Sequence, residues 1–390
     1  MDFDLTSAQA EWRDSIRDFL ARRLTPELRA EMRERGFSRS PSIEAFQKEM
    51  AAQGFWGVNW PKEYGGLDKT AVEQLILIDE LEYAGAPPIP LTVTSLGPMI
   101  IRFGTDENKR EWLPQITRGE TTFALGYSEP DAGTDLANLR TRAVLDGDEW
   151  VINGQKIWNS EAHLATHEWL AVRTDPDAPK HKGISVIIVP IDSPGISVQP
   201  LWTWGDVRTN LVFFEDVRVP RGNLIGEVNL GWGYIVGALA FERIALGTTG
   251  SLRRLFDDLV EATKRTVVDG RALSERPEVK LRLGELAVDL EIAQLFSLQT
   301  ASLIDAGGIP AKEASMQKVF TTELRTKLAD WGMQIFDLYG QLNLSDGDAP
   351  LGGALERTYR IAPFLRFGGG TNEVMRTIIA ERGYQLPRAN

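Results

Sequence analysis

Two hydroxyl side chains and a tight turn stand together in residues 125–136, which read LGYSEPDAGTDL. Pro130 fixes φ and removes a backbone donor, so regular structure stops there. Gly133 allows the chain to turn tightly, because glycine adopts positive φ without steric cost. A loop of this kind presents the hydroxyls of Ser128 and Thr134, together with backbone N–H groups, to a ligand. An ordinary surface turn is the simpler alternative.

A second stretch, residues 154–160, reads GQKIWNS and places Trp158 and Ser160 two positions apart. The flat face of an indole beside a hydroxyl donor suits a planar heteroaromatic ligand. The other tryptophans of the chain are predicted to be mostly core residues on helix faces.

A carboxylate occurs within an apolar helical stripe in residues 232–267. Ile235, Leu239, Glu242 and Leu246 follow one another at the spacing of a single helix face. A buried carboxylate is either paired or has a raised pKa, and a raised pKa suits a general base that removes a proton from carbon. A structural ion pair between Glu242 and an arginine is the alternative.

Two further clusters have a weaker chemical signal. Residues 368–370 are three glycines directly before a predicted helix, which suits either a bound anion or a tight turn, without the lysine of a phosphate-binding loop. His163 and His167 are four residues apart and Glu168 follows, yet the HExxH order is missing. We expect a solvated loop there and no metal site.

Three blocks of elements must position these residues. The first, residues 1–120, is predicted to be helical: Thr6 and Gln9 form a capping box, and Ser40 with Pro41 begins another helix. Further helices are predicted over residues 72–83, 91–103 and 106–117.

The second block, residues 121–228, changes to the period of β-strands, with turn signals at residues 146–147 and 153–154. It predicts a small barrel or sandwich. The third block, residues 229–390, is predicted to be a helical bundle. The predicted strands are 121–125, 140–145, 149–152, 155–158, 169–173, 184–190, 196–201 and 211–219, and the predicted helices are 232–267, 277–306, 310–338 and 371–383.

Composition narrows the class of protein. The chain has 390 residues and a net charge of −12, from 43 basic and 55 acidic residues, which argues against a nucleic-acid or anionic-membrane surface. It has no cysteine, which excludes disulfides and thiolate chemistry. The start is acidic and the longest apolar run, near residues 184–191, is too short to span a bilayer. We expect a cytoplasmic α+β protein of several domains.

In this order, the stretches at 125–136 and 154–160 resemble the acyl-CoA dehydrogenase family, as does the phrase WLP…GE at residues 112–120. The resemblance extends over nearly the whole chain. It implies FAD as cofactor, an N-terminal helical domain, a middle β domain and a C-terminal helical bundle. It implies that Thr134 contacts the CoA arm. The implied FAD contacts are Leu125, Tyr127, Ser128, Trp158, Ser160, Thr371 and Glu373.

The resemblance also bears on the catalytic base. Most family members take a glutamate from a Tyr-Glu-Gly-Thr turn near the C-terminus, and here Gly369 stands in its place. In the isovaleryl-CoA and long-chain branches the base lies in a Glu-Arg pair on an earlier helix, which Glu242 and Arg243 match. The family resemblance therefore implies α,β-dehydrogenation of an acyl-CoA with Glu242 as the base. Arg243 and Gly369 belong to the implied substrate site, where the Gly369 amide would bind the thioester oxygen.

Two departures concern the part of the FAD site that family members share between subunits. Of the family's Arg-x-x-Phe-Gly pattern only Arg271 is kept. In the family's Gln-x-x-Gly-Gly-x-Gly pattern, which begins here at Gln334, Asp337 and Leu338 replace two glycines. Electron-transfer flavoprotein is the implied electron acceptor, and a homotetramer, or a tetramer with a related chain, is the implied assembly. A flavin monooxygenase or oxidase on the same fold, or one subunit of a heteromeric dehydrogenase such as those of bacterial steroid degradation, are the alternatives. The acyl group itself is not defined by the sequence.

Overall fold

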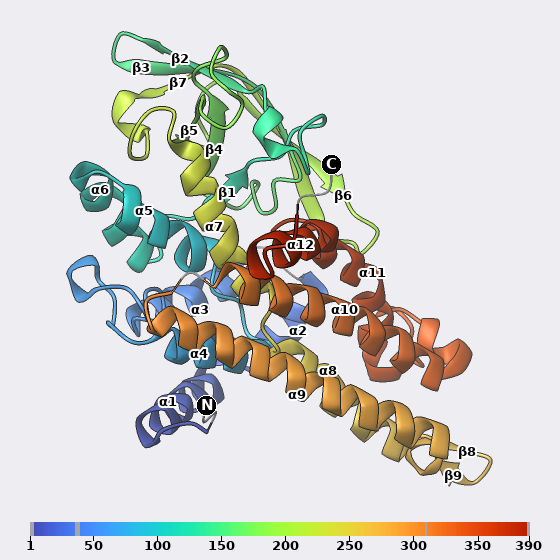
Figure 1. Cartoon of the computed structure of the whole chain (residues 1–390). Helices are drawn as coiled ribbons and strands as arrows, with labels where there is room; N and C mark the ends of the chain where they lie inside the picture. Colours follow the sequence, from blue (N-terminus) through green and yellow to red (C-terminus); the bar gives the residue numbers. More distant parts are fainter. Residues whose placement is uncertain (1–3, 36–39, 309, 388–390) are drawn as a thin grey trace. The chain divides into compact units, whose positions relative to one another are not determined.

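The computed structural model describes residues 4–35, 40–308 and 310–387, and the elements are labelled in Figure 1. The chain forms two compact units, each assembled from separate segments. Unit 1 comprises Met1–Met32, Thr70–Pro88 and Arg243–Asn390, and unit 2 comprises Arg33–Lys69 and Ile89–Glu242. The predicted sequence boundaries at residues 120 and 228 stay a prediction, because helix α4 (Ala71–Ala84) packs with C-terminal helices in unit 1.

Unit 2 begins with helices whose ends follow the predicted caps. Ser40 accepts a hydrogen bond from the amide of Ile43 and Pro41 is the first residue of its helix, so the predicted start is confirmed. The predicted helix over 91–103 contains a π-helical turn, Thr92–Leu96, before its last segment. The helices of this unit are α3 (Pro41–Ala52), α5 (Gly97–Phe103), α6 (Asp106–Thr117) and most of α7 (Gly231–Leu246).

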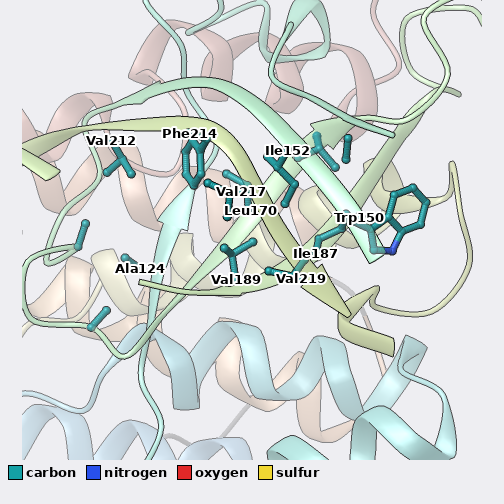
Figure 2. Close-up of a cluster of buried hydrophobic side chains, with 14 residues drawn as sticks. Ala124, Trp150, Ile152, Leu170, Ile187, Val189, Val212, Phe214, Val217 and Val219 are labelled. Carbon is teal, nitrogen blue, oxygen red and sulfur yellow. The ribbon is translucent and has the colours of Figure 1, made fainter. Parts of the chain in front are cut away.

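The strands of unit 2 form one seven-stranded sheet in which β1 pairs with β4 in parallel. The order is β1-β4-β2-β3-β7-β6, with β5 paired to β4. Its buried side chains, among them Trp150, Leu170 and Phe214, are gathered between the strands (Figure 2). This sheet confirms the predicted middle β domain. The strands are β1 (Phe123–Gly126), β2 (Arg142–Asp146), β3 (Glu149–Ile157), β4 (His167–Arg173), β5 (Ile184–Pro190), β6 (Ile196–Trp202) and β7 (Arg208–Pro220).

The predicted turn at residues 153–154 is wrong. Strand β3 runs through it, and its register against β7 shifts between Ile152 and Gly154, as in a β-bulge. Gly154 has a φ of 149°, and a Cβ there would lie 2.6 Å from Cα of Thr141. The Asn-Gly pair therefore serves a close approach of two backbones rather than a hairpin.

Unit 1 is built from helices, with α9 and α10 side by side (Figure 1). Thr6 and Gln9 form the predicted capping box of α1. No helix in the described ranges is long and apolar enough to cross a membrane. The helices are α1 (Ser7–Arg23), α4, α8 (Gly250–Arg265), α9 (Pro277–Asp305), α10 (Ala311–Ile335), α11 (Ala354–Phe367) and α12 (Asn372–Ile378), and α2 (Pro26–Arg35) begins in this unit.

The single helix predicted over 232–267 is two helices, α7 and α8, separated at residues 247–249. The Gly247 carbonyl accepts hydrogen bonds from Ser297, Gln317 and Thr321 instead of continuing the helix. The Asp79 carboxylate of α4 accepts from the amides of Thr249 and Gly250, which caps the start of α8. Sequence reasoning also missed α11, which carries Pro363 within it.

Candidate active site

The first predicted ligand loop begins where β1 ends. Leu125 is half-buried in that strand, and Gly126 has no room for a side chain, since a Cβ would lie 2.8 Å from Oε2 of Glu168. The ring of Tyr127 is buried, whereas Ser128 is half-buried. The carbonyl of Ser128 accepts a hydrogen bond of 2.9 Å from the amide of Ile157. The loop is therefore joined directly to the end of β3.

The second predicted ligand loop follows β3 and exposes its aromatic residue. Trp158 is 53% exposed and has a φ of 65°, a left-handed conformation that is rare for a bulky side chain. Asn159 holds the loop: its amide donates to the Asn210 carbonyl at 3.1 Å, and the Asn210 side chain donates to the Asn159 carbonyl at 2.8 Å. Ser160 is exposed beside it. Strain of this kind is retained where the surroundings enforce it, as at ligand sites.

A buried ion pair ties the two loops together. Lys156 is fully buried, and its Nζ donates to the Tyr127 carbonyl at 3.0 Å and to Oε1 of Glu129 at 2.8 Å. Glu129 also accepts from the amides of Arg140 and Thr141. Burial opposes ionisation of Glu129, but the charge and hydrogen bond of Lys156 outweigh burial and lower the pKa of this carboxyl. The pair therefore carries opposite charges and fixes the backbone of both loops.

A second buried carboxyl, Glu168 on β4, supports the tryptophan loop. Nδ2 of Asn159 donates to both of its oxygens at 3.1 Å. Burial raises the pKa of Glu168 to about 8, against the opposing effects of Asn159 and Lys156. Sequence reasoning treated Glu168 only as a conceivable metal ligand and missed Glu129, Lys156 and Asn159. The one available signal was that Glu168 directly precedes the continuous apolar run of β4.

The solvated loop predicted at His163 and His167 is wrong, because both side chains are half-buried and His167 begins β4. The ring of His163 lies 3.2 Å from Nδ2 of Asn210, and the ring of His167 packs against Trp112 and Phe123. In the described part of the chain no group of histidine and carboxylate side chains could hold a metal ion. Thr134 is exposed in the first loop, next to an exposed ion pair between Asp135 and Lys180.

Glu242 lies in α7, in the same unit as the two loops. On the predicted buried stripe only Ile235 is fully buried, whereas Leu239, Glu242 and Leu246 are half-buried. The prediction of a wholly buried stripe is therefore wrong. The carboxylate still reaches Tyr127 electrostatically: burial raises the pKa of the tyrosine, and the negative charge of Glu242 raises it further.

In unit 1, Arg243 is buried and its Nε donates to the Gly369 carbonyl at 2.8 Å. Gly369 and Gly370 have φ values of 64° and 98°, which form a tight turn before α12. Thr371 caps this helix, since its hydroxyl accepts from the amide of Val374 at 3.2 Å. Glu373 is exposed in the first turn of α12.

The remaining predicted cofactor residues lie on the surface of unit 1. Arg271 is exposed in a two-stranded hairpin, β8 (Val267–Val268) with β9 (Arg271–Ala272). Gln334 is exposed on α10 and donates to Asp330 at 2.9 Å. Where the family pattern has glycines after this glutamine, the chain has Asp337 and Leu338, both exposed, and Leu338 is 73% exposed.

The donors of unit 2 suit the ring system that the sequence predicts. The Tyr127 hydroxyl and Nε1 of Trp169 are both buried and lie within reach of each other, since a hydrogen bond from Trp169 acts to lower the pKa of Tyr127. The hydroxyls of Ser128 and Ser160, half-buried and exposed, are the donors that a ligand can reach. A flavin ring offers oxygen and nitrogen acceptors and a flat face for the exposed indole of Trp158. The structure therefore brings Leu125, Tyr127, Ser128, Trp158 and Ser160 together on two joined loops of donor character, which fits FAD.

Comparison with known proteins agrees with this geometry. The N-terminal, middle and C-terminal domains of acyl-CoA dehydrogenase match residues 6–120, 124–217 and 229–384. The chain belongs to the acyl-CoA dehydrogenase family, and the predicted enzyme class and three-domain fold are confirmed.

Several relatives cover the whole chain. It is 41% identical to acyl-CoA dehydrogenase FadE26 of Mycobacterium tuberculosis, over 100% of both chains, and 38% identical to FadE29 of that organism, over 100% and 99%. Among solved structures, the Tcur3481-Tcur3483 steroid ACAD is 37% identical with a TM-score of 0.92 over 100% of both chains. The ChsE4-ChsE5 complex from M. tuberculosis is 41% identical with a TM-score of 0.92, also over 100% of both.

The buried carboxyl of Glu168 makes stability depend on pH. Its pKa of about 8 lies above the ~4.3 of an exposed glutamate, so between these values the unfolded chain releases a proton that the folded chain keeps. The free energy of unfolding then falls as pH rises, by at most about 1.4 kcal/mol per pH unit. Glu168→Gln removes this titration. We expect the difference between the thermal unfolding midpoints, variant minus wild type, to increase from about pH 5 to about pH 8. Above about pH 8 this difference should stay constant.

The matched control is Glu215→Gln, because Glu215 is exposed on β7. Its midpoint should keep a constant offset from the wild type over the same range. An equally constant offset for Glu168→Gln would contradict the buried titration.

Proposed function

We propose that the protein catalyses the FAD-dependent α,β-dehydrogenation of an acyl-CoA thioester to the 2-enoyl-CoA, with Glu242 as the catalytic base. The observation that carries the proposal is the hydrogen bond from buried Arg243 to the Gly369 carbonyl. It links the residue after Glu242 to the turn in which most family members keep their base and this chain has glycine. In this proposal the base lies on α7, and the hydrogen bond from Arg243 joins α7 to the glycine turn.

The chain's own groups supply the proton chemistry in this proposal. The α-hydrogen of a thioester becomes acidic when its carbonyl oxygen accepts hydrogen bonds, because negative charge develops on that oxygen. The amide of Gly369 donates this bond, and the carboxylate of Glu242 removes the α-proton. FAD, when bound, supplies the acceptor for the β-hydride. Ser128 and Ser160 bind the polar edge of its ring, Trp158 packs on its face, and Thr134 contacts the CoA arm.

The electron acceptor in this proposal is an electron-transfer flavoprotein. A monooxygenase or oxidase on the same fold need not keep a carboxylate base, so the presence of Glu242 favours the dehydrogenase. The acyl group is proposed to belong to fatty acid or steroid side-chain catabolism, because one similar solved structure is titled a steroid ACAD.

We also propose a tetramer, either of this chain or with a related chain. Helix α9 carries an exposed apolar stripe, Leu281, Val288, Ile292 and Leu295, that no contact within the described chain covers. The exposed Asp337 and Leu338 in place of glycines favour pairing with a different chain, which would complete the shared part of the FAD site around Arg271 and Gln334. Two similar solved structures carry paired names, Tcur3481-Tcur3483 and ChsE4-ChsE5.

Glu242→Gln tests the base. The amide is nearly isosteric with the carboxylate, so the fold and the FAD content should persist. Reduction of the flavin by a panel of acyl-CoAs under anaerobic conditions should slow by at least ~10², because a positioned base contributes this much. Stopped-flow absorbance measures the rate. Reduction at the wild-type rate would exclude Glu242 as the base.

Trp158→Ala tests the cofactor site. The wild-type protein should purify yellow with non-covalent FAD, and loss of the indole face should weaken retention through lost stacking, by about 1 kcal/mol. Equilibrium dialysis against free FAD measures this change. Trp202→Ala is the control, because Trp202 is also exposed in unit 2 at the end of β6. Equal retention in the two variants would show that Trp158 does not contact FAD.

Val288→Glu tests the assembly surface. A charge in the middle of the α9 stripe should dissociate the tetramer, because an unpaired carboxylate within an apolar interface costs several kcal/mol. Light scattering at micromolar concentration measures the mass. The control, Val144→Glu, changes a residue that is 57% exposed on β2 in unit 2. A wild-type monomer at that concentration would contradict the proposal.

A further inference from the structure

A second buried cation holds the glycine turn of unit 1. Lys318 lies on α10, is fully buried, and its Nζ donates to three oxygens. These are the Arg366 carbonyl at 2.8 Å, the Gly370 carbonyl at 2.9 Å and Oδ1 of Asn372 at 2.8 Å. An ammonium group has three donors, so all of them find acceptors here. The cation therefore joins the end of α11, the turn and the start of α12.

Arg243 binds the neighbouring carbonyl of the same turn. Consecutive carbonyls, those of Gly369 and Gly370, thus accept hydrogen bonds from two buried cations on two different helices. The amides of Gly369 and Gly370 donate no hydrogen bond within the described residues. Because a peptide unit is planar, fixing the Gly369 and Gly370 carbonyls fixes the direction of the amides of Gly370 and Thr371. The Gly369 amide lies in the segment between the Arg366 and Gly370 carbonyls, and Lys318 binds both of these, so both ends of that segment are held.

The residue types of the turn do not favour one conformation. Glycine has the greatest backbone freedom of any residue, and Gly369 and Gly370 both adopt positive φ. A donor that stabilises developing charge is effective only when it is already in place, since ordering it during the reaction costs free energy. The two cations supply that order.

We propose that Lys318 is a positioning residue for the dehydrogenation, which holds residues 368–370 so that the Gly369 amide meets the thioester oxygen. This inference rests on the proposed function. The alternative is a lysine that only ties α11 to α12 and contributes to stability alone. The two roles differ in their effect on a bound thioester.

The experiment uses the FAD-loaded protein and an aryl-conjugated 2-enoyl-CoA as a product-like probe. The absorption band of such a thioester shifts to the red when its carbonyl oxygen accepts hydrogen bonds. The wild type should show a clear red shift. Lys318→Met, which keeps the length of the side chain without its donors, should lose most of this shift, and kcat for a substrate should fall roughly 10- to 10²-fold with a smaller change in KM.

Lys327→Met is the matched control. Lys327 lies on the same helix, is partly exposed and bonds to Asp289 at 2.8 Å, so its loss should leave the red shift and kcat unchanged. Lys318→Gln, whose amide retains two of the three N–H donors, is measured in the same way and provides the test if the methionine variant does not fold. We expect it to lose part of the shift.

A full red shift and wild-type kcat in a Lys318 variant, with only a lower unfolding temperature, would overturn the inference and leave the proposed function intact. A wild-type protein that neither shifts the probe nor reduces its flavin with any acyl-CoA would overturn both.

Discussion

A buried ammonium group, Nζ of Lys156, is the constraint on which the candidate cofactor site depends. It donates to the Tyr127 carbonyl and to the Glu129 carboxylate, which both belong to the first loop. Lys156 itself lies on β3, which leads directly into Trp158 of the second loop. Loops rich in glycine, proline and polar residues have few regular backbone hydrogen bonds, so they need such anchors to keep one conformation. Removal of either partner would leave a buried charge uncompensated, which costs about 3–5 kcal/mol.

The same device recurs in unit 1, where Arg243 and Lys318 bind successive carbonyls of the glycine turn. In both places a turn of the backbone is held by buried, hydrogen-bonded cations. In the proposed mechanism these hydrogen bonds fix the orientation of the glycine turn. With glycine in place of a carboxylate, the turn can contribute only its amides, and the direction of those amides depends on what holds the carbonyls.

Local signals in the sequence predicted local structure well. The capping box at Thr6 and the start of α3 at Ser40 depend on neighbouring residues alone. The break between α7 and α8 could not be predicted, because it depends on Ser297, Gln317 and Thr321, which are 50 to 74 residues away along the chain. The Asn153-Gly154 pair carried a hairpin signal, yet pairing with β7 makes it a bulge. The motif residues of the candidate site were predictable by type, whereas Lys156, Glu168 and Lys318 were not, since burial and distant partners define their roles.

The central claim is that Glu242 performs the proton chemistry although the turn at Gly369 carries no carboxylate. The most direct measurement follows exchange of the α-hydrogen with D2O in a bound 3-thia-acyl-CoA, which has an acidic α-position but no β-carbon to oxidise. Mass spectrometry would report deuterium in the recovered thioester. The account predicts rapid exchange with the wild type and exchange slowed at least ~10² by Glu242→Gln, since the base alone is removed. Exchange at equal rates in the two proteins would contradict it.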